Sequence, residues 1–163
     1  MEEWYVVRTK PRQEQLALEN LERQSYQCFC PWIARRRKRI GKIQVYKEAF
    51  FPGYLFVKMD LDSTNTSPIC STRGVNGLIS FGSSVIPVRE DVINTLRLYI
   101  TSNGLIEWDH PDFISGQELC IEDGPMEGLN AIFQAKKGED RAILLLNLLG
   151  EYREVEIPIS ALR

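Results

Sequence analysis

The side chains that could ligate a metal or act as nucleophiles are few in this chain. Its 163 residues contain four cysteines, Cys28, Cys30, Cys70 and Cys120, and a single histidine, His110. A Cys-x-Cys pair followed by two distant cysteines lacks the spacing of a zinc site, and one histidine excludes a multi-histidine metal centre. The sequence also lacks a phosphate-binding loop and a nucleophile–base pair. We therefore expect no cofactor, no metal and no enzymatic activity.

The basic side chains are a stronger signal, because they are concentrated in the first part of the chain. Residues 1–100 contain 15 Lys and Arg against 10 Asp and Glu, whereas residues 101–163 contain 5 against 12. Five consecutive cations, Arg35–Arg39, form a basic ribbon. This asymmetry indicates a polyanionic partner for the first part, or attraction between the two parts. A solvated strand or loop face would also explain the ribbon.

The sequence disfavours membrane and secreted proteins. No window contains about 18 consecutive apolar residues, which a membrane span would need. The N-terminus, Met1–Trp4, lacks the basic segment and apolar run of a signal peptide. We expect a cytoplasmic protein without a membrane partner, whose cysteines remain free thiols.

Hydropathy and turn residues predict the elements that position these side chains. Strands are expected at residues 4–8, 28–32, 43–46, 54–59, 78–81 and 86–88, and helices at residues 12–24 and 89–100. Turns are marked by Gly41, by Pro52-Gly53 and by Gly82. This order predicts an α+β domain over residues 1–100, with an antiparallel or mixed sheet flanked by helices.

The last third of the chain gives conflicting signals. Residues 101–113 lose periodicity and contain Gly104 and Pro111, which predicts a linker. Residues 117–122, 131–134 and 155–159 resemble the strands of a small barrel. Residues 140–149, however, are dominated by Leu and Ala, which are strong helix formers. This disagreement argues against a single well-defined fold for residues 114–163.

Several segments resemble the NusG family of transcription elongation factors. Trp4–Val7 matches the opening strand of the family's N-terminal domain, Phe51–Val57 its central strand, and Thr72–Val75 the loop before a late strand. Gly116–Gly128 is similar to the family's KOW motif, although Asn130 stands where that motif has a glycine. The resemblance implies a NusG-type sandwich followed by a small KOW-type domain.

Within this family, three stretches are more similar to the specialised RfaH-like branch. They are Lys10–Gln24, Val45–Glu48 and Arg141–Leu148, the last of which replaces a valine-rich strand of the general factor. RfaH-like proteins hold the tail as an α-helical hairpin against the N-terminal domain, and after release the tail refolds as a five-stranded β-barrel. The resemblance implies the same switch here, and the conflicting local signals are consistent with it.

The resemblance also implies an apolar polymerase-binding patch with a cover. The residues expected to contact the clamp helices of the largest RNA polymerase subunit are Tyr54, Phe56, Phe81, Ile93 and Leu96, and Thr66 is expected near the gate loop of the second-largest subunit. An ordinary buried core would also explain each apolar residue. The expected cover comprises Met126, Leu129, Phe133, Leu145, Leu148 and Leu149. Glu48 and Arg141 are expected to form an interdomain salt bridge, in the place where RfaH-like proteins have one.

A second implied site is a basic rim for the non-template DNA strand in the transcription bubble. Its expected members are Lys10, Arg12, Gln13, Thr72 and Arg73. Lys and Arg neutralise phosphates, and polar side chains at a helix start reach unpaired base edges. Pro11, Arg12 and Asn20 depart from the RfaH pattern, so the DNA element that is read stays open.

The leading interpretation is an operon-specific antitermination factor that acts as a monomer. It would bind RNA polymerase and non-template DNA, and its released tail would recruit a small-subunit ribosomal protein. One alternative is a general NusG-type factor with a permanent β-barrel and sequence-independent recruitment. A nucleic-acid-modifying enzyme is the least favoured alternative, because no catalytic constellation supports it.

Overall fold

The computed structural model of the chain describes residues 2–82, 84–106, 131–133, 135 and 137–151. Its centre is a five-stranded antiparallel sheet of β1 (Glu3–Thr9), β2 (Gln27–Phe29), β5 (Tyr54–Met59), β6 (Val75–Leu78) and β9 (Pro87–Val88). The strand order is β2-β5-β1-β6, and β9 also pairs with β1. β1 and β5 pair along their lengths, from Glu3 opposite Met59 to Arg8 opposite Tyr54. The antiparallel α+β prediction is confirmed for this part of the chain.

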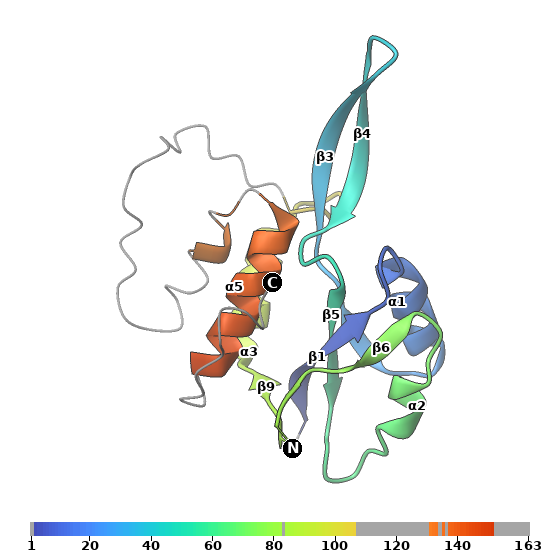
Figure 1. The fold of residues 1–163 in the computed structure, drawn as a ribbon, viewed down its shortest axis with the longest axis vertical. Coiled ribbons are helices and arrows are strands. Elements are labelled where there is room, and N and C mark those ends of the chain that lie inside the picture. Colours follow the sequence, from blue (N-terminus) through green and yellow to red (C-terminus); the bar gives the residue numbers. More distant parts are fainter. Residues whose placement is uncertain (1, 83, 107–130, 134, 136, 152–163) are drawn as a thin grey trace.

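Both faces of this sheet are covered, which explains why β1 is apolar at consecutive positions. Trp4 and Val6 point to one face and Tyr5 and Val7 to the other, and all four are buried. One face is covered by α1 (Glu14–Arg23). The opposite face is covered by α3 (Glu90–Leu98) and by α5 (Gly138–Glu151) (Figure 1). Because successive side chains of a strand alternate between faces, a strand covered on both sides is apolar throughout.

A long two-stranded hairpin projects from the sheet. It is formed by β3 (Trp32–Arg39) and β4 (Lys42–Ala49), which pair from Trp32 opposite Ala49 to Arg39 opposite Lys42 (Figure 1). The remaining short elements are α2 (Ser67–Cys70), β7 (Ser80–Phe81) and β8 (Ser84–Val85). The sequence predicted the second hairpin strand only in part and did not predict β3, because five consecutive cations carry no strand-like alternation.

Where the structure describes the tail it is mainly helical, which is one of the two conformations that the sequence left open. Residues 131–133, expected within a strand, are helical, and α5 follows the helical preference of its Leu and Ala residues. The strands expected at 117–122 and 155–159 lie outside the described residues, as do Met126 and Leu129. The local helical preference of α5 is stabilised by its packing on the apolar surface of the domain.

The predicted linker begins as part of the domain. Ile106 is fully buried, forms β-bridges with Ile33 and Ile100, and donates its backbone N–H to the carbonyl oxygen of Trp32 at 2.7 Å. Residues 107–113 of that linker lie outside the described part of the chain. Among the described residues, no helix is long and apolar enough to cross a membrane.

Candidate macromolecule-binding surfaces

The predicted patch and its predicted cover meet in one apolar cluster. Phe56, Ile93 and Leu96 are completely buried there, and Tyr54 packs against them while remaining half-buried. From the tail, the same cluster contains Phe133, Leu145, Leu148 and Leu149. Four residues of the predicted cover thus contact the surface that they were expected to mask.

Two neighbouring phenylalanines, which the sequence reasoning did not single out, form the middle of this contact. Phe50 and Phe51 are each 1% exposed and pack edge to face with their ring centroids 4.9 Å apart. The ring of Phe133 lies 5.6 Å from that of Phe50 and 4.4 Å from that of Tyr99. Because aromatic rings bury large areas, this group carries much of the packing between the tail and the domain. The Phe-Phe pair before Pro52 was the available signal.

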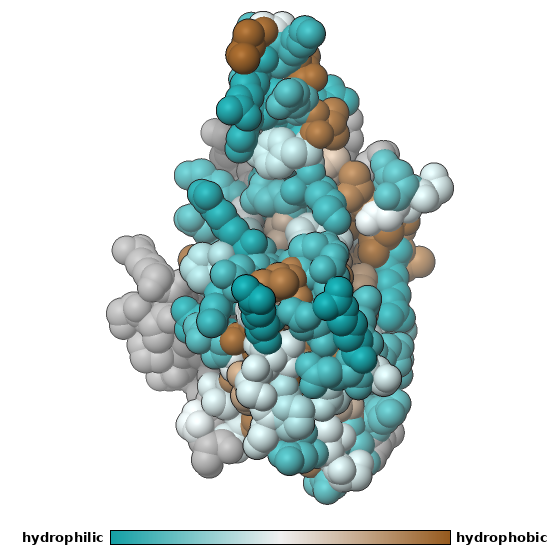
Figure 2. Space-filling view, turned by 90° about the vertical axis from the view of Figure 1, so that its right-hand side faces the viewer, coloured by the Kyte–Doolittle hydropathy of each residue, from teal (hydrophilic) through white to brown (hydrophobic). Residues whose placement is uncertain are grey.

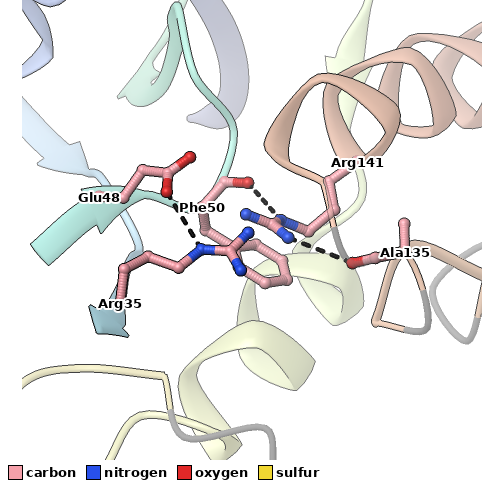
Figure 3. A network of polar contacts seen from close by, with 5 residues as sticks. All are labelled: Arg35, Glu48, Phe50, Ala135 and Arg141. Carbon is pink, nitrogen blue, oxygen red and sulfur yellow. Dashed lines mark hydrogen bonds and ion pairs between the residues drawn. The ribbon is translucent and has the colours of Figure 1, made fainter. Parts of the chain in front are cut away.

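Arg141 is the polar centre of the same contact. Its side chain is buried, its Nε donates to the carbonyl oxygen of Phe50 at 2.7 Å, and its Nη1 donates to the carbonyl oxygen of Ala135 at 3.1 Å (Figure 3). The guanidinium also lies over the Phe50 ring, 4.6 Å from the centroid. Burial, together with the nearby charge of Arg35, lowers the pKa of Arg141 to about 10, while Glu48 and Asp140 oppose the shift. The group still remains charged at neutral pH.

Glu48 and Arg141, the predicted interdomain ion pair, lie close enough for the Glu48 charge to raise the pKa of Arg141, and their direct pairing stays a prediction. Among the described residues, the carboxylate of Glu48 pairs with Arg35, whose Nε lies 3.1 Å from Oε2 (Figure 3). Arg35 and Glu48 lie diagonally across the two hairpin strands, since Arg35 is opposite Tyr46 and Glu48 is opposite Ile33, and this places both on the same face of the hairpin. Glu48 still lies at the tail contact, since its Oε1 would lie 3.1 Å from a Cβ at Gly138.

The basic rim forms where α1 packs on the loop before β6. Gly74 permits this approach, because a Cβ there would lie 2.9 Å from the backbone nitrogen of Ala17, and its φ of +95° favours glycine. Lys10 donates its backbone N–H to the carbonyl oxygen of Gly74 at 2.9 Å. This hydrogen bond places Lys10 next to the loop that carries Arg73, and both side chains are exposed on one rim.

Thr72 differs from the other predicted rim residues because it is buried. Its hydroxyl donates to the carbonyl oxygen of Pro68 at 2.6 Å and accepts from Nε2 of Gln24 at 2.8 Å. Asn20 of α1 donates to the carbonyl oxygen of Arg73 at 3.2 Å. The sequence reasoning missed Asn20 and Gln24 as anchors of this loop. Their spacing of four residues, which puts both on one face of α1, was the available signal.

Arg12 and Gln13 lie at the start of α1, beside the hairpin. Arg12 is exposed and adopts a left-handed backbone with a φ of 60°, which is uncommon for a residue other than glycine. Gln13 is half-buried and precedes the first residue of α1. Arg12 lines an open groove between α1, β4 and the start of α5, whose other lining residues include Gln15, Trp32, Tyr46, Lys47 and Lys137.

Two further predicted residues are Thr66, which precedes α2, and Phe81, which is described only by its backbone. Thr66 is half-buried and precedes the short helix α2, where its carbonyl oxygen accepts from the backbone N–H of Cys70 at 3.1 Å. Phe81 lies in β7. Within the part of the chain that the structure describes, no group of three or more His, Cys, Asp or Glu residues could hold a metal ion.

The described residues combine an apolar patch under α5 with a basic rim beside α1 and an exposed basic hairpin, and such surfaces are typical of a module that binds macromolecules. A family model described as "Transcription termination factor nusG" matches residues 2–97. The chain belongs to the NusG family.

Named relatives are similar in sequence over most of the chain. The transcription termination/antitermination protein NusG of Thermus thermophilus is 24% identical over 180 residues, covering 97% of this chain and 96% of that protein. The Chlamydia trachomatis protein of the same name is 25% identical, covering 96% and 91%. A solved structure described as "Domain interaction in Thermotoga maritima NusG" aligns with a TM-score of 0.40 at 24% identity, covering 59% of this chain and 55% of that one.

Proposed function

We propose that this protein is a transcription antitermination factor that binds RNA polymerase through the apolar patch of Tyr54, Phe56, Ile93 and Leu96. Relatives that cover nearly the full chain are named as transcription termination/antitermination proteins. In the RfaH-like proteins that the chain resembles, the matching patch receives the clamp helices of the largest RNA polymerase subunit. An apolar surface of this kind needs a partner or a cover, because exposed apolar patches promote non-specific association.

The observation that carries this proposal is the shared cluster of the patch and the tail. Leu145 and Leu149 of α5 are buried against the same cluster as Phe56 and Leu96. Polymerase and α5 therefore compete for one surface, and release of the tail precedes binding. Such competition supports the specialised RfaH-like role, since a permanent barrel would leave the patch open.

The basic rim supports a second contact, with the single-stranded non-template DNA. Lys10 and Arg73 are exposed on neighbouring segments. The loop that carries Arg73 is held against α1 by hydrogen bonds from Asn20 and Gln24. Exposed cations neutralise phosphates, whereas a rigid loop fixes which base edges are reached. Sequence-specific recruitment to particular operons, and a ribosomal protein bound by the released tail, complete the proposal.

Recruitment to stalled elongation complexes tests this function directly. Complexes of one polymerase are stalled on templates that differ only in the exposed non-template strand, and binding of the full chain is measured on each. We expect binding to vary at least tenfold with this sequence and to fall on Arg73→Gln substitution. Equal binding to every template would instead indicate the general NusG-type factor, and the absence of binding to all of them would overturn the polymerase assignment.

A further inference from the structure

The β3–β4 hairpin carries a feature that the patch and the rim do not use. Its two strands are joined by Ile40 and Gly41, which have φ values of 52° and 71°. Two consecutive left-handed residues form the tight turn whose twist suits a two-stranded ribbon. Residues 36–47 are all exposed, and the ribbon extends beyond the rest of the molecule (Figure 1).

The pairing register places cations on both faces of this ribbon. On one face, Arg36 lies opposite Val45 and Lys38 lies opposite Ile43. The other face presents Arg35, Arg37, Arg39, Lys42 and Tyr46, and the Arg37 guanidinium lies 4.8 Å from the centre of the Tyr46 ring. Figure 2 shows the hairpin at the top of the molecule as hydrophilic atoms with a few apolar groups near the tip.

This charge arrangement is unfavourable for the hairpin by itself. An isolated two-stranded ribbon is only marginally stable in water, and like charges opposite each other, such as Arg39 and Lys42, destabilise it further. Phosphates on both sides would relieve that repulsion. The charge pattern thus indicates a polyanion that surrounds the ribbon, whereas a single strand would meet one face only.

The dimensions of double-stranded DNA fit such a ribbon. The major groove of B-form DNA is roughly 12 Å wide and admits a two-stranded β-ribbon, whereas the minor groove, at roughly 6 Å, does not. The tip residue Ile40 is uncharged and 95% exposed, which suits contact with base edges and thymine methyl groups at the groove floor. The flanking cations then face the phosphates of the two groove walls.

We propose that the β3–β4 hairpin is a separate binding site for double-stranded DNA and enters the major groove tip first. Arg36 and Lys38 contact one phosphate backbone, and Arg37, Arg39 and Lys42 contact the other. The site is distinct from the rim of Lys10 and Arg73, and it needs neither polymerase nor single-stranded DNA.

Binding of the full chain to a blunt 20-base-pair DNA duplex, followed by fluorescence anisotropy between 25 and 200 mM salt, tests this proposal. One variant removes two cations from the first face (Arg36→Gln with Lys38→Gln), and another removes two from the second (Arg37→Gln with Arg39→Gln). Each phosphate contact contributes about 0.9 to the slope of log affinity against log salt. We therefore expect each variant to bind at least fivefold more weakly at low salt, with a slope reduced by about 1.8.

A control removes two cations that lie away from the hairpin, Lys58 of β5 and Arg89 before α3, by Lys58→Gln with Arg89→Gln, and is expected to bind like the wild type. All four side chains on the hairpin are exposed, so circular dichroism should show an unchanged fold. Loss confined to one face, an equal loss in the control, or tighter binding to an RNA duplex than to the DNA duplex would each overturn the proposal. None of these outcomes bears on binding to polymerase, so the two proposals can fail independently.

Discussion

The Nε of Arg141 lies 2.7 Å from the carbonyl oxygen of Phe50, and this hydrogen bond joins the tail helix to the middle of the apolar patch. The charge of Arg141 is buried against the ring of Phe50, and two of its donors are held by backbone carbonyl oxygens. A backbone carbonyl cannot be titrated or removed by a surface substitution. We therefore expect the polar attachment of the tail to depend mainly on Arg141 and less on the residue at position 48.

Arg141→Met should release the tail more readily than the wild type. The substitution keeps the apolar stem and removes the donors to Phe50 and Ala135. Leaving the buried carbonyl of Phe50 without a donor costs about 1–3 kcal/mol, and the half-buried carbonyl of Ala135 costs less. We expect a loss of about 2–4 kcal/mol in the stability of the closed form. Amide hydrogen exchange across α5 measures this loss, and unchanged protection would contradict the assigned role of Arg141.

Glu48→Ser should have a much smaller effect on the tail. The carboxylate pairs with Arg35, both side chains are about one-third exposed at 33% and 32%, and exposed ion pairs contribute about 0–1 kcal/mol. Peak doubling in NMR spectra reports the released fraction. A population of released tail as large as that of Arg141→Met would show that Glu48 holds α5 directly, as the resemblance had implied.

Thr72 should act on DNA through Arg73, because its own hydroxyl is occupied by Pro68 and Gln24. Thr72→Val and Gln24→Ala are each expected to weaken binding to single-stranded DNA about threefold to tenfold, since one hydrogen bond contributes about 1 kcal/mol. A double-mutant cycle with Arg73→Gln tests whether Thr72 acts through Arg73. If Thr72 works through Arg73, Thr72→Val has little effect in the Arg73→Gln background, whereas additive losses point to a direct contact.

The thiols of Cys28 and Cys30 should react slowly at neutral pH. Burial raises the pKa of each from 9.0 to about 12, so their thiolate fraction at pH 8 is about a thousandfold below that of an ordinary cysteine. Exposed Cys70 is expected to be alkylated before Cys28 and Cys30, whose rates should rise with pH up to about 12. Mass mapping of alkylated peptides measures the rates, with urea-unfolded protein as the control for equal reactivity.

These raised thiol pKa values also affect stability, in a direction that follows from linkage. The folded chain keeps both thiols protonated at a pH where the unfolded chain ionises them. Their contribution is therefore fully present below about pH 9 and is lost as the pH rises towards 12. Preferential labelling of Cys30 over Cys70 at pH 8 would contradict the burial on which this prediction depends.

The sequence predicted the sheet well because its strands carry strong local signals. β5 has the predicted bounds, β1 was recognisable as a continuous β-branched and aromatic run, and the apolar face of α3 was recognisable from its helical periodicity. Hairpin strand β3 was missed, because its arginines form a strand through pairing with β4 and not through propensity. The hydrogen bonds of Thr72 with Gln24 and of Arg141 with Phe50 join residues far apart in the chain, and no local pattern encodes such partners.

The competition between α5 and polymerase is tested most directly by opening the tail and measuring polymerase affinity. Leu145 is fully buried in the shared cluster, so Leu145→Asp places a charge among apolar side chains and should expel α5. Half-buried Asn147→Asp adds the same charge to α5 without removing an apolar contact and serves as the control. The apparent affinity for RNA polymerase scales with the fraction of the protein whose tail is released. We therefore predict that Leu145→Asp binds RNA polymerase at least tenfold more tightly than the wild type or the control. Equal or weaker binding by Leu145→Asp, with the N-terminal domain still folded by circular dichroism, would contradict it.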